Sequence, residues 1–299
     1  MKQTLFFLGP EDKTYGTLQK GSTAEGEIWL AMNGVLPLTL LIQKDPLIIK
    51  NSTVVVAGHN KNVNFHGAVQ LNLFNLVGSA DSSSQSLLAA KRLADNSHVA
   101  RVFNHPDFVA LTARKVASER YGDIPGLHVP KMTAIADPFV EQETLNRYQG
   151  SGRELLLIEY REIRGWNDLF HKVRIAFVDG EIFPRHCILS NHWCIHSHTR
   201  DEYMIGNHDA RNYEAEFLDR FYDRLGQRQL QVLKELHHRI QLDVWGLDCA
   251  FLPDEDGLLF YEANACMNLL PLDDRPEFHY LNDHTKKIKR AIKRLIVRG

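Results

Sequence analysis

The chain has 299 residues, of which 44% are hydrophobic and 24% are charged, and its formal net charge at pH 7 is −2. This composition excludes a disordered or fibrous chain, and the length is sufficient for two or three subdomains. The balance of 35 basic and 37 acidic residues provides no overall positive field that could recruit nucleic acid. Any phosphate-binding site must therefore be local.

Neither a signal peptide nor a membrane span is expected. Residues 1–10 (MKQTLFFLGP) contain one Lys and a short apolar run that Pro10 ends, which is too short for a secretory signal. No later apolar stretch reaches the length of a membrane span. We therefore predict a cytoplasmic protein that does not bind membranes. In that compartment the cysteines are expected to be reduced thiols: Cys187, Cys194, Cys249 and Cys266.

The first hundred residues alternate short strand-like runs with turns, a pattern typical of α/β folds. The runs cover residues 4–8, 38–42, 53–57 and 68–77. After the last run, the sequence DSSS at 81–84 offers N-cap oxygens for a helix that we expect to end near Asn96. A second helix is expected over 108–121, where apolar residues recur at helical spacing.

The rest of the chain has further strand and helix patterns around a weakly patterned stretch at 124–152. Continuous apolar runs at 155–160 and 173–178 predict buried strands, and Asp179-Gly180 predicts a hairpin turn. Amphipathic periodicity predicts helices, of which the C-terminal one carries a solvated basic face. These helices are expected over 212–225, 227–240 and 285–298.

The stretch 246–264 (GLDCAFLPDEDGLLFYEAN) has the pattern of two strands joined by a turn. A five-residue loop centred on Glu255 would oppose Leu252 to Leu258, Ala250 to Phe260 and Asp248 to Glu262. Side chains on one strand face recur every two residues, so Asp248, Glu262 and Asn264 point the same way. Because the Cβ atoms of an opposed pair lie about 4.5–5.5 Å apart, these three side chains converge.

Two facing carboxylates destabilise a sheet unless a positive charge lies between them. Hard oxygen ligands of this kind suit Mg²⁺ that is shared with phosphate oxygens. Asp248, Glu262 and Asn264 are therefore the predicted metal ligands. The alternative is a hairpin whose acidic face is only hydrated, and it has less support because the opposite face is apolar and fixes the register.

An Asp on one strand, a hairpin and Glu-x-Asn on the next strand resemble the magnesium site of the ATP-grasp family. The resemblance extends from Asn72 to Leu270 and is to a subgroup often attached to tetratricopeptide repeats. It implies that ATP and Mg²⁺ bind between two lobes. Further stretches that carry it are 103–106 (FNHP), 112–114 (TAR), 124–126 (IPG), 129–130 (VP), 172–174 (KVR), 178–180 (VDG), 183–186 (FPRH), 191–193 (NHW) and 214–218 (EAEFL).

The resemblance also implies a nucleotide site at the hinge between the lobes. Glu159 and Tyr160 fall where the hinge faces adenine and ribose, although they also fit an ordinary strand end. Lys131 would reach the α-phosphate or the adenine. The resemblance fails over 130–155, where the family normally has a second cationic strand and a Gly-rich loop over the triphosphate. Residues 150–153 (GSGR) suit a shortened phosphate loop, but they fit a linker better.

Cations are expected beside the metal site. Lys172 and Arg174 alternate on one strand face, so both can point at the same phosphates, although an ordinary solvated face would show the same pattern. Arg185 would add a third positive charge. Arg174 and Arg185 are the predicted catalytic residues, and Lys172 is assigned to nucleotide binding.

Histidine and cysteine side chains cluster in 185–198 (RHCILSNHWCIHSH), which raises the possibility of zinc. Four of them would line one strand face, and three in a row already span about 13 Å, too far for a single tetrahedral ion. These four are His192, Cys194, His196 and His198. A two-strand site that includes His186 stays open as a minor alternative, as does contact of His196 or His198 with a substrate.

We therefore expect an ATP-grasp fold of α/β class with an N-terminal α/β subdomain (1–105), a shortened small lobe (106–154) and a C-terminal lobe with the magnesium site (155–299). The predicted function is ATP-dependent ligation of a carboxylate to an amine through an acyl phosphate. The substrates would be small molecules or peptides, without nucleic acid, and a homodimer is allowed. The alternatives are an ATP-grasp kinase and a non-catalytic nucleotide or metabolite sensor.

Overall fold

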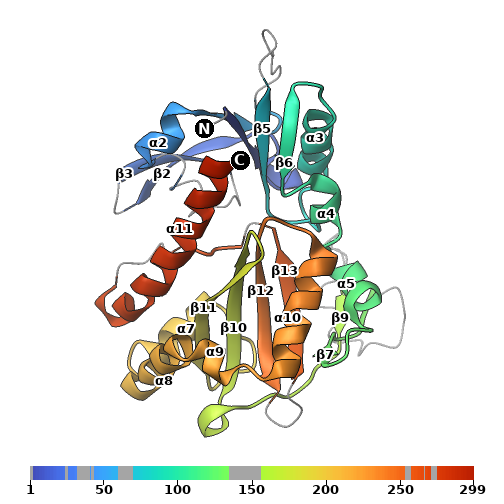
Figure 1. Ribbon diagram of the computed structural model, residues 1–299. Helices are drawn as coiled ribbons and strands as arrows, with labels where there is room; N and C mark the ends of the chain where they lie inside the picture. The colour runs from blue at the N-terminus through green and yellow to red at the C-terminus, as the bar shows by residue number, and fades with distance from the viewer. Residues whose placement is uncertain are drawn as a thin grey trace.

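The computed structural model describes residues 3–23, 26–31, 41, 44–59, 70–134, 156–252, 257–265, 267–270 and 275–299. Two sheets form the body of the molecule, one from the N-terminal third of the chain and one from its C-terminal half (Figure 1). Helix α11 (Asn282–Arg298) runs beside the lower sheet, and its end lies next to the upper one. None of the described helices is both long and apolar enough to cross a membrane.

The N-terminal sheet is parallel, with the strand order β4-β1-β5-β6. The central strands β1 and β5 are almost wholly buried, which explains their continuous apolar runs. The predicted strands at 4–8, 53–57 and 68–77 are confirmed, the last from Leu71 onward. Of the predicted strand at 38–42 only Leu41 is described, and it is helical rather than extended. The strands are β1 (Thr4–Gly9), β4 (Ser52–Val56), β5 (Leu71–Val77) and β6 (Val99–Phe103), with a separate hairpin of β2 (Leu18–Thr23) and β3 (Gly26–Ala31).

Short helices flank this sheet, and the predicted helix after β5 is confirmed as α3 (Ser84–Ala94). A distant residue supplies the capping hydrogen bonds of this helix. The Asp12 carboxylate accepts hydrogen bonds from the Ser84 and Gln85 backbone N–H groups. The oxygens of 81–84 were expected to do this, and Ser83 at the N-cap makes no such bond. The other two elements are η1 (Asp12–Thr14) and α2 (Pro46–Lys50).

The single helix predicted over 108–121 is wrong, because two helices cover this range. They are α4 (Pro106–Ala110) and α5 (Arg114–Tyr121). The Thr112 hydroxyl donates to the Val109 carbonyl and closes the first helix, and Ala113 is extended at the start of the second. The break sets the direction of α5 and so the position of Arg114.

The C-terminal sheet has the order β11-β10-β12-β13-β7 and is antiparallel except for β7, which runs parallel to β13. The Asp179-Gly180 turn is confirmed, and both residues have the positive φ of a tight hairpin turn. A small antiparallel pair, β8 with β9, lies outside this sheet. The strands are β7 (Leu127–His128), β8 (Met132–Ala134), β9 (Leu156–Ile158), β10 (Phe170–Val178), β11 (Glu181–Ser190), β12 (Val244–Leu252) and β13 (Gly257–Asn264).

Helices pack against this sheet and bury its apolar side chains. Trp245 is fully buried and stacks on Phe177 with ring centroids 3.9 Å apart, and His237 of α10 stacks beyond it. The predicted helix at 227–240 is confirmed, and the one at 212–225 is present as two helices. The helical elements are η2 (Trp166–Asp168), α7 (Ser197–Met204), α8 (His208–Asp219), α9 (Phe221–Arg224), α10 (Gln227–Ile240) and η3 (Pro276–Leu281). Cys187, Cys194 and Cys249 are free thiols, as predicted.

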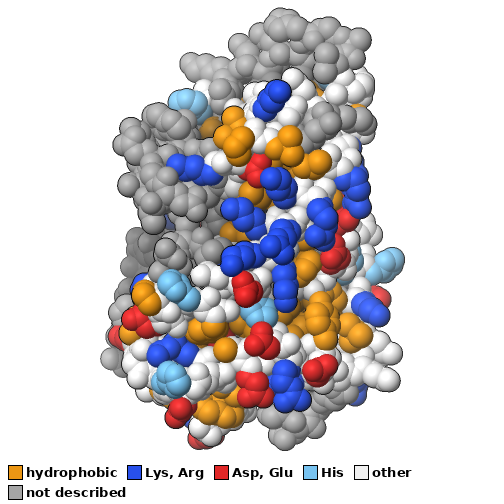
Figure 2. All heavy atoms as spheres, turned by 60° about the vertical axis from the view of Figure 1, so that its left-hand side comes forward, with side chains coloured by type: hydrophobic (Ala, Val, Ile, Leu, Met, Phe, Trp, Pro, Cys, Tyr) orange, Lys and Arg blue, Asp and Glu red, His pale blue; other side chains and the backbone are white. Residues whose placement is uncertain are grey.

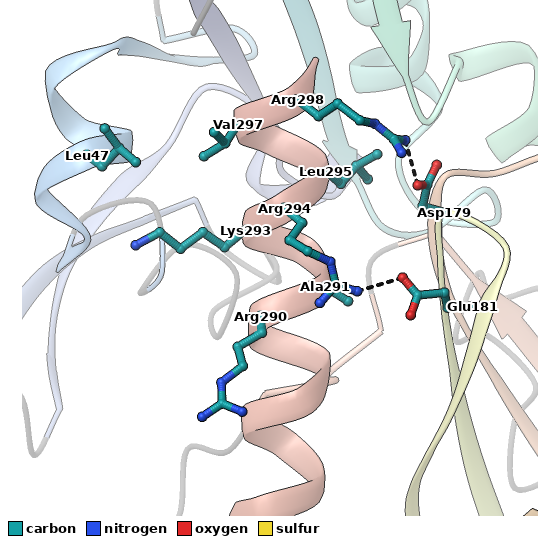
Figure 3. A pocket seen from close by; sticks show the side chains of 10 residues that line it. All are labelled: Leu47, Asp179, Glu181, Arg290, Ala291, Lys293, Arg294, Leu295, Val297 and Arg298. Atoms are coloured by element: carbon teal, nitrogen blue, oxygen red, sulfur yellow. Dashed lines mark hydrogen bonds and ion pairs between the residues drawn. The ribbon is translucent and has the colours of Figure 1, made fainter.

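The predicted basic face of the C-terminal helix gathers Lys and Arg side chains along α11 (Figure 2). Several of them are paired and join the two parts of the molecule: Lys293 contacts Asp45, Arg294 contacts Glu181 and Arg298 contacts Asp179. A cavity of about 720 Å³ lies among these residues and α2 (Figure 3). None of the predicted site residues lines this cavity. The ion pairs of Arg294 and Arg298 along its wall connect α11 to Glu181 and Asp179 and hold the helix in place.

His171 predicts a loss of stability in acid. It is buried in β10, where its Nε2 accepts a hydrogen bond from the Phe251 backbone N–H, and burial lowers its pKa to about 4. The unfolded chain binds this proton near pH 6.5 and the folded chain only near pH 4. The free energy of unfolding should therefore fall by up to about 3 kcal/mol as the pH drops through this range.

Denaturant titrations from pH 7 to pH 4 would measure this dependence. His171→Gln keeps an acceptor but does not titrate, so its stability should vary less steeply with pH than that of the parent. Part of the slope would remain, because burial also lowers the pKa values of His186 and His237. An unchanged slope in the variant would contradict the assignment.

Candidate active site

The predicted opposition of Asp248 and Glu262 across β12 and β13 is confirmed. The register nearer the turn is not as predicted, since Leu252 faces Gly257 and Ala250 faces Leu259. The connection is one residue shorter than expected, and Tyr261 is an extra residue that forms a β-bulge just before Glu262. The two differences cancel at Asp248, which is why the predicted pair is correct.

Asp248 is held by two cations from the adjacent strand β10. Arg174 donates from Nε and Nη2 to the two carboxylate oxygens at 2.7 and 2.8 Å, and the Lys172 Nζ lies 3.3 Å from Oδ2. The Asp248 residue is only 1% exposed. Burial by itself would raise its pKa, but the hydrogen bonds and charges of Arg174 and Lys172 outweigh burial and lower it. The carboxylate is therefore ionised and electrostatically compensated.

Glu262 is also paired with a cation, and this partner was missed in the sequence. Arg114 at the start of α5 donates from Nη2 to the Glu262 Oε2 at 2.6 Å. The side chains of Arg114 and Glu262 are 49% and 26% exposed, so solvent reaches this pair. The break between α4 and α5 places Arg114 here, and no local pattern in the sequence indicates that break.

The three predicted metal ligands lie close together on the two strands, since Asn264 faces Gly246 two register pairs beyond Asp248 and Glu262. Two carboxylates and an amide are a donor set that Mg²⁺ accepts when phosphate oxygens and water complete its shell. Asp248 is paired with Arg174 and Lys172, and Glu262 is paired with Arg114. Both carboxylates are therefore stabilised by positive charge beside them. The residues therefore fit Mg²⁺ with nucleotide, and in this structure Arg174 and Lys172 balance the charge of Asp248.

A zinc site finds no support. Among the described residues, no group of three or more His, Cys, Asp or Glu is arranged to hold a metal ion. His192 and Cys194 lie in a loop after β11 and His196 caps α7, so they are not on one strand as predicted. The side chain of His198 lies outside the described part of the structure.

Arg185 is the extra residue of a second β-bulge, because Arg174 faces His186 while Ile175 faces Pro184. This bulge lies on the other side of β10 from the one at Tyr261, so irregular strands flank the Arg174–Asp248 pair on both sides. Burial and the nearby positive charge of Arg174 lower the pKa of Arg185 to about 10. It remains a cation at neutral pH, next to Arg174 as predicted.

The predicted hinge residues form a separate group. The Lys131 backbone N–H donates to the Glu159 side chain at 3.0 Å, and the Glu159 N–H donates to the Lys131 carbonyl at 2.9 Å. Tyr160 is 58% exposed and meets the equally exposed Trp193 edge to face, with ring centroids 5.9 Å apart. Trp193 was not predicted to be part of a site. Residues 150–153 lie outside the described part of the chain.

The segment that follows the predicted hinge residues meets the start of β10. The hinge segment leads into the start of β10 through a bridge between Arg164 and Phe170. Lys172 and Arg174 follow at two-residue steps, and Arg174 is the residue opposite Asp248. With a rise of about 3.3 Å per residue, the start of β10 lies about 13 Å along the strand from Arg174, the partner of Asp248.

No protein-family model matches the chain, and no curated protein matches it. Solved structures resemble it over its whole length. D-alanyl-alanine synthetase A from Vibrio cholerae has a TM-score of 0.51 and 10% identity, and covers 100% of this chain and 99% of its own. A RimK domain protein ATP-grasp from Sphaerobacter thermophilus has a TM-score of 0.51 and 14% identity, with coverage of 98% and 99%. The chain thus has the ATP-grasp fold.

Proposed function

We propose that this protein is an ATP-dependent carboxylate–amine ligase that uses Mg²⁺. The proposal rests above all on Asp248, Glu262 and Asn264, which lie together beside the cations of β10. The ATP-grasp fold supports nucleotide binding between lobes, and one of the solved structures that this chain resembles is a D-alanyl-alanine synthetase. The magnesium site, the acyl phosphate and the domain bounds 1–105, 106–154 and 155–299 belong to this proposal.

The layout of the site suits the length of ATP. Adenine would lie against the backbone at Glu159 and Tyr160, and the triphosphate would extend along β10 past Lys172. The γ-phosphate would then reach Arg174 and the metal ligands, at a distance of about 13 Å from the start of the strand. Lys131 pairs with Glu159 through its backbone, which leaves its exposed side chain available to the nucleotide.

The reaction would proceed in two transfers. A carboxylate oxygen of the substrate attacks the γ-phosphorus and ADP leaves, and the amine then attacks the acyl carbon, loses a proton and expels phosphate. Lys172 and Arg174 would turn from Asp248 to the phosphate oxygens and stabilise their charge. Asp248, Glu262 and Asn264 would hold Mg²⁺, which would supply neutralisation of the phosphate charge.

Trapping of the acyl phosphate tests the proposal. Hydroxylamine should replace the amine and give a hydroxamate when ATP and the carboxylate substrate are present. Cleavage of ATP to ADP and phosphate should depend on that carboxylate. Arg220→Gln, which changes an exposed residue between α8 and α9, is the control and should behave as the parent.

The other candidate functions are distinct outcomes of this assay. A stable phosphorylated product without hydroxamate would establish a kinase instead. Binding of Mg-ATP without cleavage, in a broad screen of carboxylates, would establish a sensor.

A further inference from the structure

Three buried nitrogen atoms near the active site have no hydrogen-bond partner among the described residues. They are Arg185 Nε, His186 Nε2 and Arg200 Nε. They are three of nine such buried side-chain atoms in the described residues, and these three side chains lie close enough to affect one another's pKa values. An unpaired buried donor costs about 1–3 kcal/mol. Three of them in one neighbourhood indicate that a ligand completes their hydrogen bonding.

The surrounding elements form a closed ring that fixes these groups. Helix α7, which carries Arg200, packs against β11, which carries Arg185. The Arg200 guanidinium lies over the Phe278 ring of η3, 3.8 Å from its centroid, and η3 packs against α8. The bulge at Arg185 keeps it out of the regular alternation of β11. Within the described part of the chain, packing rather than an ion pair therefore positions both guanidinium groups.

The acid in this ring does not neutralise both arginines. Glu214 of α8 is fully buried, and its oxygens accept hydrogen bonds from the Cys187 backbone N–H and the Tyr280 hydroxyl. Arg185 and Arg200 each depress the pKa of His186, whose burial is the largest cause of that shift. His186 is therefore neutral, and the single carboxylate of Glu214 cannot balance the charges of both Arg185 and Arg200.

We propose that Arg185 and Arg200, together with His186, bind the substrate carboxylate that is phosphorylated. This inference rests on the proposed ligase function and adds the place and recognition of the acceptor. Two guanidinium groups and a neutral imidazole offer planar N–H donors, which match the two oxygens of a carboxylate.

The order of the strands separates this site from the phosphate site. Across the sheet, Glu262 lies on β13, Asp248 on β12, Lys172 and Arg174 on β10, and Arg185 on β11. Strands are about 4.8 Å apart, so Arg185 lies about two strand spacings, or 10 Å, from Asp248 along the sheet. The metal and triphosphate would occupy β12 and β10, which leaves the carboxylate on the β11 and α7 side.

Nuclear magnetic resonance of the arginine Nε–Hε groups tests the inference with acetate as the probe. The signals of Arg185 and Arg200 are assigned by their loss in Arg185→Lys and Arg200→Lys. In protein saturated with Mg²⁺ and a non-hydrolysable ATP analogue, acetate should shift both signals saturably, while chloride and acetamide should not. Arg200→Gln should weaken acetate binding at least tenfold and leave the affinity for the analogue unchanged, and Arg220→Gln should change neither.

Two results would overturn this inference and leave the ligase proposal standing. In the first, the analogue alone shifts both signals and acetate adds nothing, which makes the arginines phosphate ligands. In the second, inorganic phosphate shifts them and acetate does not. If Arg200→Gln does not fold, the same comparison in Arg200→Lys decides. Failure of the ligase proposal would appear separately, as absence of hydroxamate in the trapping assay.

Discussion

Replacement of Asp248 by Asn is expected to destabilise the protein by about 3–5 kcal/mol and to abolish Mg²⁺-dependent nucleotide binding. Asp248 is buried between Arg174 and Lys172, whose side chains are only 15% and 16% exposed. Loss of the carboxylate charge leaves two cations in a low-dielectric site without compensation. Chemical denaturation measures the first effect, and calorimetric titration with the Mg²⁺ complex of an ATP analogue measures the second.

This expectation reverses the one that the sequence suggests. Two facing carboxylates without partners would repel each other, so removal of one would stabilise the metal-free protein. The ion pairs of Asp248 and Glu262 remove that repulsion. The same residue change therefore has opposite effects on stability, depending on whether the carboxylates are considered alone or with their cations.

A double-mutant cycle isolates the pair. Arg174→Gln in the Asp248→Asn background should recover part of the lost stability, because it removes one of the unpaired cations. Asp123→Asn, which breaks an exposed ion pair with Arg239, is the control and should leave the denaturation midpoint close to that of the parent. Equal effects of Asp248→Asn and the control would show that the buried pair has no special role.

Local patterns in the sequence were sufficient to predict most of the sheets and the hairpin that carries the acids. Alternation along β13 and the turn before it oppose Asp248 to Glu262, even though the predicted loop was one residue too long and the bulge was not predicted. A β-bulge inserts one residue that has no partner on the neighbouring strand, and no particular residue type marks it in a sequence. Tyr261 and Arg185 could therefore not be identified as the extra residues.

Contacts between distant segments could not be predicted. Arg114 and Glu262 are 148 positions apart, and their contact depends on where α4 ends and α5 begins. Asp12 caps α3 from 72 positions away in the same manner. The contact of the Arg200 guanidinium with the Phe278 ring could not be predicted either, because it depends on how η3 packs against the rest of the protein. The resemblance to a family indicated which residues matter but not which cations hold them.

Glu262→Gln should separate metal binding from stability. The Glu262 side chain is 26% exposed and its partner Arg114 is 49% exposed, so their ion pair contributes no more than about 1 kcal/mol. Gln keeps an acceptor for Arg114, and the denaturation midpoint should change little. Loss of one of two carboxylate ligands should nevertheless weaken binding of the Mg²⁺ complex of an ATP analogue at least a hundredfold and abolish hydroxamate formation.

Arg114→Gln is the matched variant, because it breaks the same contact and keeps the carboxylate. It should still bind the Mg²⁺ complex, and its affinity for Mg²⁺ alone should rise, since the cation that competes for Glu262 is gone. Calorimetry with Mg²⁺ and with the complex would compare the two variants directly. Equal affinity of Glu262→Gln and the parent for the complex would exclude Glu262 as a ligand, and equal losses in both variants would show that the ion pair, rather than the carboxylate, supports binding.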